Sequence, residues 1–252
     1  MVKAANRIDA DPPANDTDSL TPIGPGAYAL WRATTLGVVT EALEQRLILN
    51  LMGGFSGCRV LDAGCGDGAL ACAAASQGAE VTGIDVDPAM LAAARSRAAK
   101  AGIRATFSEG RIEHLPFPAA SFDVVVAVTV LCFVADAAGA VREMARVLRP
   151  GGRLVIGELG RWSLWAAIRR MRGWLGSPTW SSARFRTAKE LRASAEQAGL
   201  SVTEMRGAVY YPPIGVIASA LATADPWLGR LTSFGAAFIA LGATAAGSNR
   251  EK

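Results

Sequence analysis

Two carboxylates flanking a glycine turn are the residues of this chain that most directly suggest chemistry. Asp62 ends an apolar run that starts at Cys58, Gly64 and Gly66 follow it, and Asp85 ends the next apolar run. Glycines between a strand and a helix let ligand atoms approach the backbone, and the helix start presents unpaired N–H groups. A carboxylate at the end of the second strand can accept hydrogen bonds from both hydroxyls of a ribose. We therefore expect an adenosine-type ligand here.

The glycine pattern by itself allows two adenosine ligands. Gly64-x-Gly66-x-x-Ala69 satisfies the dinucleotide pattern, and Asp85 stands where the ribose-binding acid should. Asp62 argues against a dinucleotide, because its carboxylate would repel a pyrophosphate but can hold an ammonium group directly or through water. At this point a nicotinamide-dependent oxidoreductase stays the alternative.

The elements that must position these residues alternate between strands and helices. Strands are expected at 58–63, 80–85, 105–109, 122–131, 154–158, 200–211 and 234–243, and helices at 28–52, 68–77, 88–100, 136–148 and 188–198. The valine-rich run at 122–131 reads as a strand buried on both faces, which is typical of a parallel sheet. The alternation predicts an α/β fold with a doubly wound, mostly parallel sheet.

Composition restricts the class of protein only loosely. The 252 residues are 51% hydrophobic and 19% charged with a net charge of +4, which suits anionic small molecules, lipid headgroups or nucleic acid equally well. Four cysteines and one histidine lack the usual spacing of a zinc site, so no metal is expected, and unpaired cysteines fit a reducing cytoplasm. Residues 1–26 lack periodicity and a secretion signal, so we predict a disordered arm, a domain over 27–252 and a cytoplasmic location.

Five short sequence motifs follow one another along the chain. They are Val-Leu-Asp-Ala-Gly-Cys-Gly-Asp-Gly at 60–68, Gly-Ile-Asp-Val-Asp at 83–87, Glu-His-Leu-Pro-Phe at 113–117, Ser-Phe-Asp-Val-Val at 121–125 and Arg-Val-Leu-Arg-Pro-Gly-Gly at 146–152. Over about residues 28–210 the chain resembles the class I S-adenosylmethionine-dependent methyltransferases of the type 11 group. The resemblance implies a Rossmann-like seven-stranded sheet with an antiparallel last strand. It also implies S-adenosylmethionine as methyl donor and S-adenosylhomocysteine as product.

The resemblance also assigns roles to individual residues. Those it places around the cofactor are Asp62, Gly64, Cys65 and Gly66 at the methionine part, Asp85 at the ribose, Val86 and Met90 at the adenine, and Val128 near the sulfonium. Arg111 replaces the family's aspartate that meets the adenine amino group, and arginine cannot accept a hydrogen bond. Either backbone groups of Arg111 and Ile112 contact the adenine, or adenine recognition is weaker or shifted to other groups. A non-catalytic binding protein with a degenerate methyltransferase fold is therefore a second alternative. Core packing is the competing interpretation of Val86, Met90, Ile112 and Val128.

The reaction implied is methyl transfer by direct displacement, which needs alignment more than special side chains. A general base is required only if the acceptor carries a proton of high pKa, and the candidates are His114, Glu158, Tyr210 and Tyr211.

The segment before the glycine loop contains candidates to cover the ligand, namely Tyr28, Trp31 and Thr35. The alternative is that this segment is a helix packed at the domain edge.

Acceptor identity is expected to depend on an α-helical lid formed by residues 160–186 and 212–233, where tryptophans and aliphatic residues dominate. These segments favour a small apolar or amphipathic, lipid-like acceptor, with the acceptor atom left open. The basic amphipathic stretch at 161–175 predicts either peripheral membrane contact or a helix over the mouth of the site. Nucleic acid is disfavoured, because no long basic groove is apparent. The oligomeric state does not follow from the sequence.

Overall fold

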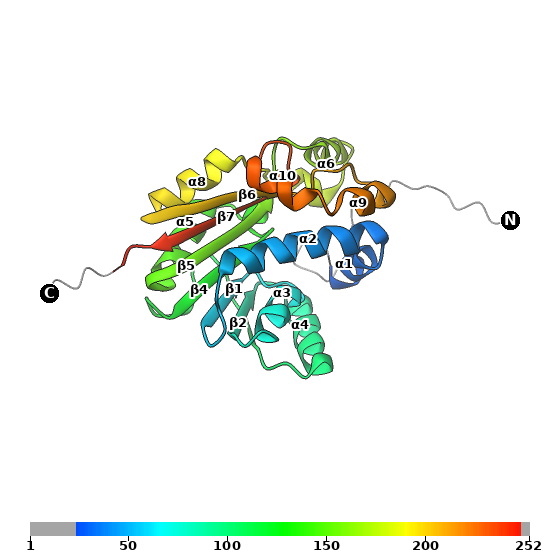
Figure 1. Cartoon of the computed structure of the whole chain (residues 1–252). Coiled ribbons are helices and arrows are strands. Elements are labelled where there is room, and N and C mark those ends of the chain that lie inside the picture. The colour runs from blue at the N-terminus through cyan, green and yellow to red at the C-terminus, as the bar shows by residue number, and fades with distance from the viewer. Residues whose placement is uncertain (1–23, 248–252) are drawn as a thin grey trace.

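A computed structural model describes residues 24–247 and contains one seven-stranded sheet (Figure 1). Its strand order is β3-β2-β1-β4-β5-β7-β6. The strands are β1 (Arg59–Ala63), β2 (Glu80–Asp85), β3 (Thr106–Glu109), β4 (Phe122–Val128), β5 (Leu148–Leu159), β6 (Leu200–Ala208) and β7 (Phe238–Ala245). Strands β1 to β5 pair in parallel, and β7 runs antiparallel between β5 and β6. The predicted doubly wound sheet with an antiparallel last strand is confirmed.

Helices cover both faces of the sheet (Figure 1). Helices α2 (Thr35–Met52), α3 (Ala69–Ala75) and α4 (Pro88–Ala101) share one buried apolar cluster with the strands. Helices α5 (Ala137–Val147) and α8 (Ala188–Gln197) share the other. Strand β4 is buried across residues 124–127, as a strand covered on both faces must be.

Several predicted boundaries are wrong, and two of these errors have local backbone causes. The helix expected over 28–52 is divided into α1 (Pro25–Arg32) and α2, because Thr34 is extended and its hydroxyl accepts the Gly37 N–H at 3.0 Å as an N-cap. The strand expected over 122–131 ends at Val128, because Thr129 adopts a left-handed φ of 51° before the 3₁₀ helix η1 (Leu131–Phe133). Most of the predicted arm 1–26 lies outside the described residues. Helix α1 begins at Pro25, just before the end predicted for the arm.

Both segments expected to form the lid are helical. Helices α6 (Leu164–Trp174) and α7 (Pro178–Ser182) follow β5, and α9 (Gly215–Leu221) and α10 (Asp225–Leu231) connect β6 to β7. Figure 1 shows α6, α9 and α10 together at one end of the molecule, close to α1. These helices stand over the carboxyl edge of the parallel strands, where ligands of open α/β sheets bind.

Candidate active site

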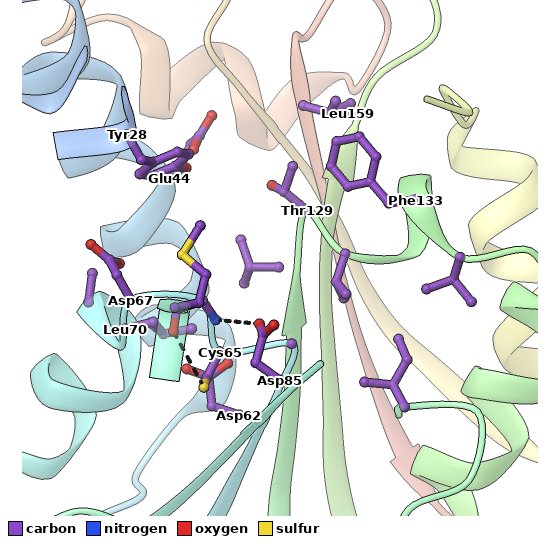
Figure 2. Close-up of a pocket in the computed structure, with 18 of the residues that line it drawn as sticks. Tyr28, Glu44, Asp62, Cys65, Asp67, Leu70, Asp85, Thr129, Phe133 and Leu159 are labelled. Carbon is purple, nitrogen blue, oxygen red and sulfur yellow. Dashed lines mark hydrogen bonds between the residues drawn. The ribbon is translucent and has the colours of Figure 1, made fainter. Parts of the chain in front are cut away.

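A cavity of about 540 Å³ lies at this carboxyl edge (Figure 2). Its walls come from the segments that follow β1, β2, β3 and β4, from the end of β5, and from α1, α2, α6 and α7. The predicted cofactor residues that line it are Tyr28, Trp31, Asp62, Gly64, Cys65, Gly66, Asp85, Val86, Met90, Arg111, Ile112 and Val128. The folding of the chain thus brings residues from five separate segments to one cavity.

The glycine loop has a backbone that other residues adopt only with strain. Gly64, Gly66 and Gly68 have φ values of +80°, +52° and +73°. A Cβ on Gly64 would lie 2.4 Å from a methyl carbon of Val130, whereas a Cβ on Gly66 would meet nothing within 4 Å. The absence of a side chain at Gly64 therefore lets the loop pack closely against Val130. At Gly66 it leaves open space on the side of the loop that a ligand can approach.

Asp85 holds this loop in place. One carboxylate oxygen accepts the Gly66 N–H at 2.8 Å, and the other accepts the Asp87 N–H at 3.0 Å. Burial raises the pKa of Asp85, and these backbone hydrogen bonds oppose that rise. Because each carboxylate oxygen has two lone pairs, both can still accept a hydroxyl hydrogen from a ligand.

Asp62 has a buried oxygen that lacks a partner. The side chain is 3% exposed, and within residues 24–247 no group donates a hydrogen bond to its Oδ2. Burial raises the pKa of Asp62 to about 7, and the negative charge of Asp85 adds to the rise. An unsatisfied buried acceptor costs about 1–3 kcal/mol. A cationic donor bound in the cavity would remove that cost, so the site fits a ligand carrying an ammonium group.

An ion-pair network closes one side of the cavity. Asp67 of the glycine loop pairs with Arg32 of α1 and, at 2.6 Å, with Arg97 of α4. Arg32 also pairs with Glu41 of α2 at 2.7 Å, and its guanidinium lies 4.3 Å from the centre of the Tyr28 ring. The network joins two N-terminal helices to the loop. Sequence reasoning missed Arg32, because a helical pattern does not say which face meets the loop.

Thr35 is the one predicted covering residue that does not line the cavity. The helix break at Thr34 makes Thr35 the first residue of α2, where it lies against Gly215 of α9. The prediction that Thr35 covers the ligand is therefore wrong in this structure.

None of the four predicted general bases lines the cavity. His114 is exposed on the segment after β3, and the Tyr210 hydroxyl donates to the carbonyl of Thr232. Tyr211 is buried, and its hydroxyl lies 3.0 Å from that of Thr40. Glu158 is fully buried below η1, where it accepts the Leu131 N–H at 2.8 Å and burial raises its pKa to about 7. Each has a structural partner or faces solvent, so the structure does not support them as bases.

The half of the cavity away from the glycine loop is mostly apolar. Its apolar lining residues are Ile48, Phe133, Leu159, Trp165, Trp180, Val209 and Ala237. Two charged residues border this surface, Glu44 of α2 where the two halves of the cavity meet and Arg169 of α6. The Arg169 guanidinium lies between two indoles, 4.9 Å from the Trp165 ring centre and 4.8 Å from that of Trp180. Sequence reasoning missed both charges.

Strained backbone borders this half of the cavity. Thr129 and Val209 both line it with left-handed φ values of 51° and 64°, which are uncommon for β-branched residues. The buried Asp225 carboxylate stabilises the second of these turns by accepting the N–H groups of Val209 and Tyr210 at 2.9 and 2.8 Å. Such strain is kept only where surrounding contacts enforce it.

Within residues 24–247 the structure contains no group of three or more His, Cys, Asp or Glu side chains arranged to hold a metal ion. The cysteines at 58, 65, 72 and 132 are all free.

The sheet topology, the glycine loop and the two carboxylates together define a class I methyltransferase architecture. Residues 61–156 match the model of the family described as "Methyltransferase domain". The chain is 34% identical over 174 residues to a ubiquinone biosynthesis O-methyltransferase of Methylobacterium sp., an alignment that covers 67% of this chain and 70% of that relative. It is 39% identical over 161 residues to the protein of the same name from Methylocella silvestris, covering 62% of this chain and 63% of the relative. The chain belongs to the S-adenosylmethionine-dependent methyltransferase family.

Solved structures agree on the fold. A Thermotoga maritima protein described as an S-adenosylmethionine-dependent methyltransferase and possible histamine N-methyltransferase aligns with a TM-score of 0.67 at 22% identity. The alignment covers 87% of this chain and 94% of that one. The protein is accordingly a methyltransferase that uses S-adenosylmethionine, and the oxidoreductase and the non-catalytic alternatives are set aside.

Proposed function

We propose that this enzyme methylates a hydroxyl oxygen on a small amphipathic aromatic acceptor. The observation that carries the proposal is the acceptor half of the cavity, where aromatic and aliphatic walls surround two charged residues, Glu44 and Arg169. Such a surface binds a ring or an alkyl chain by burial and orients a polar group through few contacts. The names of the relatives, which are O-methyltransferases of ubiquinone biosynthesis, support the same class of acceptor.

We propose that the glycine-loop half holds the cofactor. Asp62 would bind the ammonium group with its unpartnered oxygen, and Asp85 would bind the ribose hydroxyls. Val86, Met90 and Ile112 supply apolar walls for the adenine. The Arg111 guanidinium pairs with Glu113 at 2.9 Å, so backbone groups at 111 and 112 are left to contact the adenine edge.

When bound, the cofactor supplies an electrophilic methyl group. The chain positions the cofactor and the acceptor relative to each other. Val128 and Thr129 lie between the two halves of the cavity, and the ion pairs of Arg32 hold the covering helix α1 in place. Alignment of the acceptor oxygen with the methyl carbon lowers the activation barrier. In well-oriented intramolecular reactions this effect is worth about 7–11 kcal/mol.

A series of alkyl-substituted catechols tests the proposed acceptor class. We expect an O-methylated product by mass spectrometry, with kcat/KM rising about fourfold per added CH₂, since each buried CH₂ contributes ~0.8 kcal/mol, until the cavity is full. Alkylbenzenes of the same chain length but without hydroxyls are the matched control and should give no product. Methylation of amines alone, or indifference to chain length, would overturn the proposal.

We also propose that the lid end of the molecule contacts a lipid surface. Its exposed apolar side chains are Trp162, Leu164, Met171, Trp174 and Leu175 on or beside α6, Val216 and Leu221 on α9, Trp227 and Leu231 on α10, and Phe234. Trp174 is 87% exposed and Val216 81%. Helix α6 adds Arg170 and Arg172, which favours anionic headgroups. No helix in residues 24–247 is long and apolar enough to cross a membrane.

Vesicle flotation tests this contact. The protein should float with vesicles containing anionic lipid and less with neutral ones, and Trp174→Asp combined with Val216→Asp should abolish flotation because two apolar anchors are lost. Ser201→Asp, which adds a charge on exposed β6, is the control and should float like the unmodified protein. Equal recovery with and without anionic lipid would refute the proposal.

A further inference from the structure

Glu44 lies at the junction of the two halves of the cavity. On the same helix, the Thr40 hydroxyl contacts Tyr211 beside the acceptor half, and the Gln45 amide reaches the carbonyl of Ala69 at the glycine loop at 3.5 Å. Glu44 is one helical turn after Thr40 and adjacent to Gln45, so its side chain projects between these two contacts.

Figure 2 shows Glu44 beside Tyr28 on the side of the cavity formed by α1 and α2. Thr129, Phe133 and Leu159 stand on the opposite side. An acceptor that enters between these walls would place its polar group close to the Glu44 carboxylate.

Glu44 differs from the other acidic side chains that line the cavity. Among the described residues these are Glu41, Glu44, Asp62, Asp67, Asp85 and Glu113. Glu41 and Asp67 pair with Arg32, and Glu113 pairs with Arg111. Asp62 and Asp85 belong to the glycine-loop half. Glu44 is therefore the carboxylate placed to meet an acceptor.

We propose that Glu44 is the general base that takes the proton from the acceptor hydroxyl. The proposal rests on the proposed function, because it requires an acceptor with a proton to lose. The O–H bond breaks and its proton moves to a Glu44 oxygen. The freed electron pair on the acceptor oxygen forms the new O–CH₃ bond, and the electron pair of the breaking S–CH₃ bond stays on sulfur, which neutralises the sulfonium.

The surroundings of Glu44 set the pH at which it can act. The charged or titratable groups that face it are Glu41 and Arg32 on the N-terminal helices, Arg169 on α6, Asp225 on α10, and the phenols of Tyr28 and Tyr211. Burial raises the pKa of Glu44 to about 8, and the positive charge of Arg169 opposes the rise. Below pH 8 the carboxyl is mostly protonated and cannot accept a proton. We therefore expect kcat/KM to rise about tenfold per pH unit up to pH ~8 and then level off.

Glu44→Gln removes the base without changing the volume of the side chain. At pH 7.5 it should lower kcat with an alkylcatechol by about 10²–10⁴-fold, the usual contribution of a general base, and the plateau near pH 8 should disappear. Affinity for S-adenosylhomocysteine should stay unchanged. The thermal midpoint should not fall, because a carboxyl whose pKa is raised by burial lowers stability at this pH and the amide removes that cost. Arg46→Gln, on the exposed face of the same helix, is the matched control and should keep both rate and profile.

A binding measurement adds a readout without catalysis. The probe is 4-methylcatechol, whose ultraviolet absorbance separates the phenol from the phenolate and whose hydroxyl ionises above about pH 8, as ordinary phenols do. Glu44 is charged in that pH range. Its carboxylate should raise the pKa of the bound probe, so the probe should ionise at a pH about 1 unit higher in the unmodified protein than in Glu44→Gln. Equal ionisation in both proteins, or a Glu44→Gln enzyme with unchanged kcat and pH profile, overturns the role of Glu44. If the unmodified enzyme methylates no hydroxylated ring at all, the proposed function itself fails.

Discussion

Asp85→Ala is expected to weaken S-adenosylhomocysteine binding by on the order of a hundredfold or more. The substitution removes the acceptor proposed for both ribose hydroxyls, and it also frees the N–H groups of Gly66 and Asp87 that hold the loop. Charge-assisted hydrogen bonds contribute about 1.5–3 kcal/mol each, so a loss of at least ~3 kcal/mol is expected. Isothermal titration calorimetry measures this loss directly.

Glu80→Ala is the matched control for that substitution. Glu80 lies at the exposed start of the same strand β2, far along the strand from the glycine loop. Its replacement removes a carboxylate without touching the cavity, so the dissociation constant should stay within about twofold. If both variants bound the ligand equally well, Asp85 would not be a cofactor residue.

Trp165→Ala should cause the largest loss of stability among substitutions in the acceptor half. Trp165 is 2% exposed, packs in the core cluster of α2 and β7, and donates its indole N–H to the Tyr211 carbonyl at 2.7 Å. Truncation of a buried tryptophan leaves a cavity and typically costs about 3–5 kcal/mol. Denaturant unfolding should show this decrease in the free energy of unfolding.

Trp174→Ala provides the comparison on the same helix. Trp174 is 87% exposed, so its removal should change the free energy of unfolding by less than about 0.5 kcal/mol. The fraction of Trp165→Ala protein that still folds should show a second effect. Its KM for the acceptor should rise by a larger factor than its dissociation constant for S-adenosylhomocysteine, because the Trp165 ring borders the acceptor half and contacts Arg169. Similar stability of the two variants would show that Trp165 is not a structural wall of the site.

The gathering of the proposed cofactor residues at one edge of the sheet could be predicted, because these residues lie at or just after the ends of their strands. Asp62 lies near the end of β1, Gly64 and Gly66 come directly after it, and Asp85 ends the neighbouring strand β2. Parallel neighbouring strands bring such residues to one edge, so a sequence pattern is enough to place them.

The acceptor half could not be predicted in the same way, because it is assembled by tertiary packing. Glu44, Trp165 and Trp180 lie on three separate helices that meet only in the folded chain. Tyr210 and Tyr211 show the opposite error: they are adjacent in sequence just after β6, but neither lines the cavity, and their hydroxyls contact Thr232 and Thr40. A helical pattern identifies an apolar stripe, and it does not identify which single carboxylate faces a cavity.

A crystal structure of the enzyme with S-adenosylhomocysteine bound tests the central claim most directly. The predicted result has the ammonium group within hydrogen-bond distance of Asp62 Oδ2, directly or through one water, and the ribose hydroxyls on Asp85, with the sulfur facing Val128 and the acceptor half open beside Glu44. A ligand that lay elsewhere, with Asp62 Oδ2 still unpartnered, would contradict it.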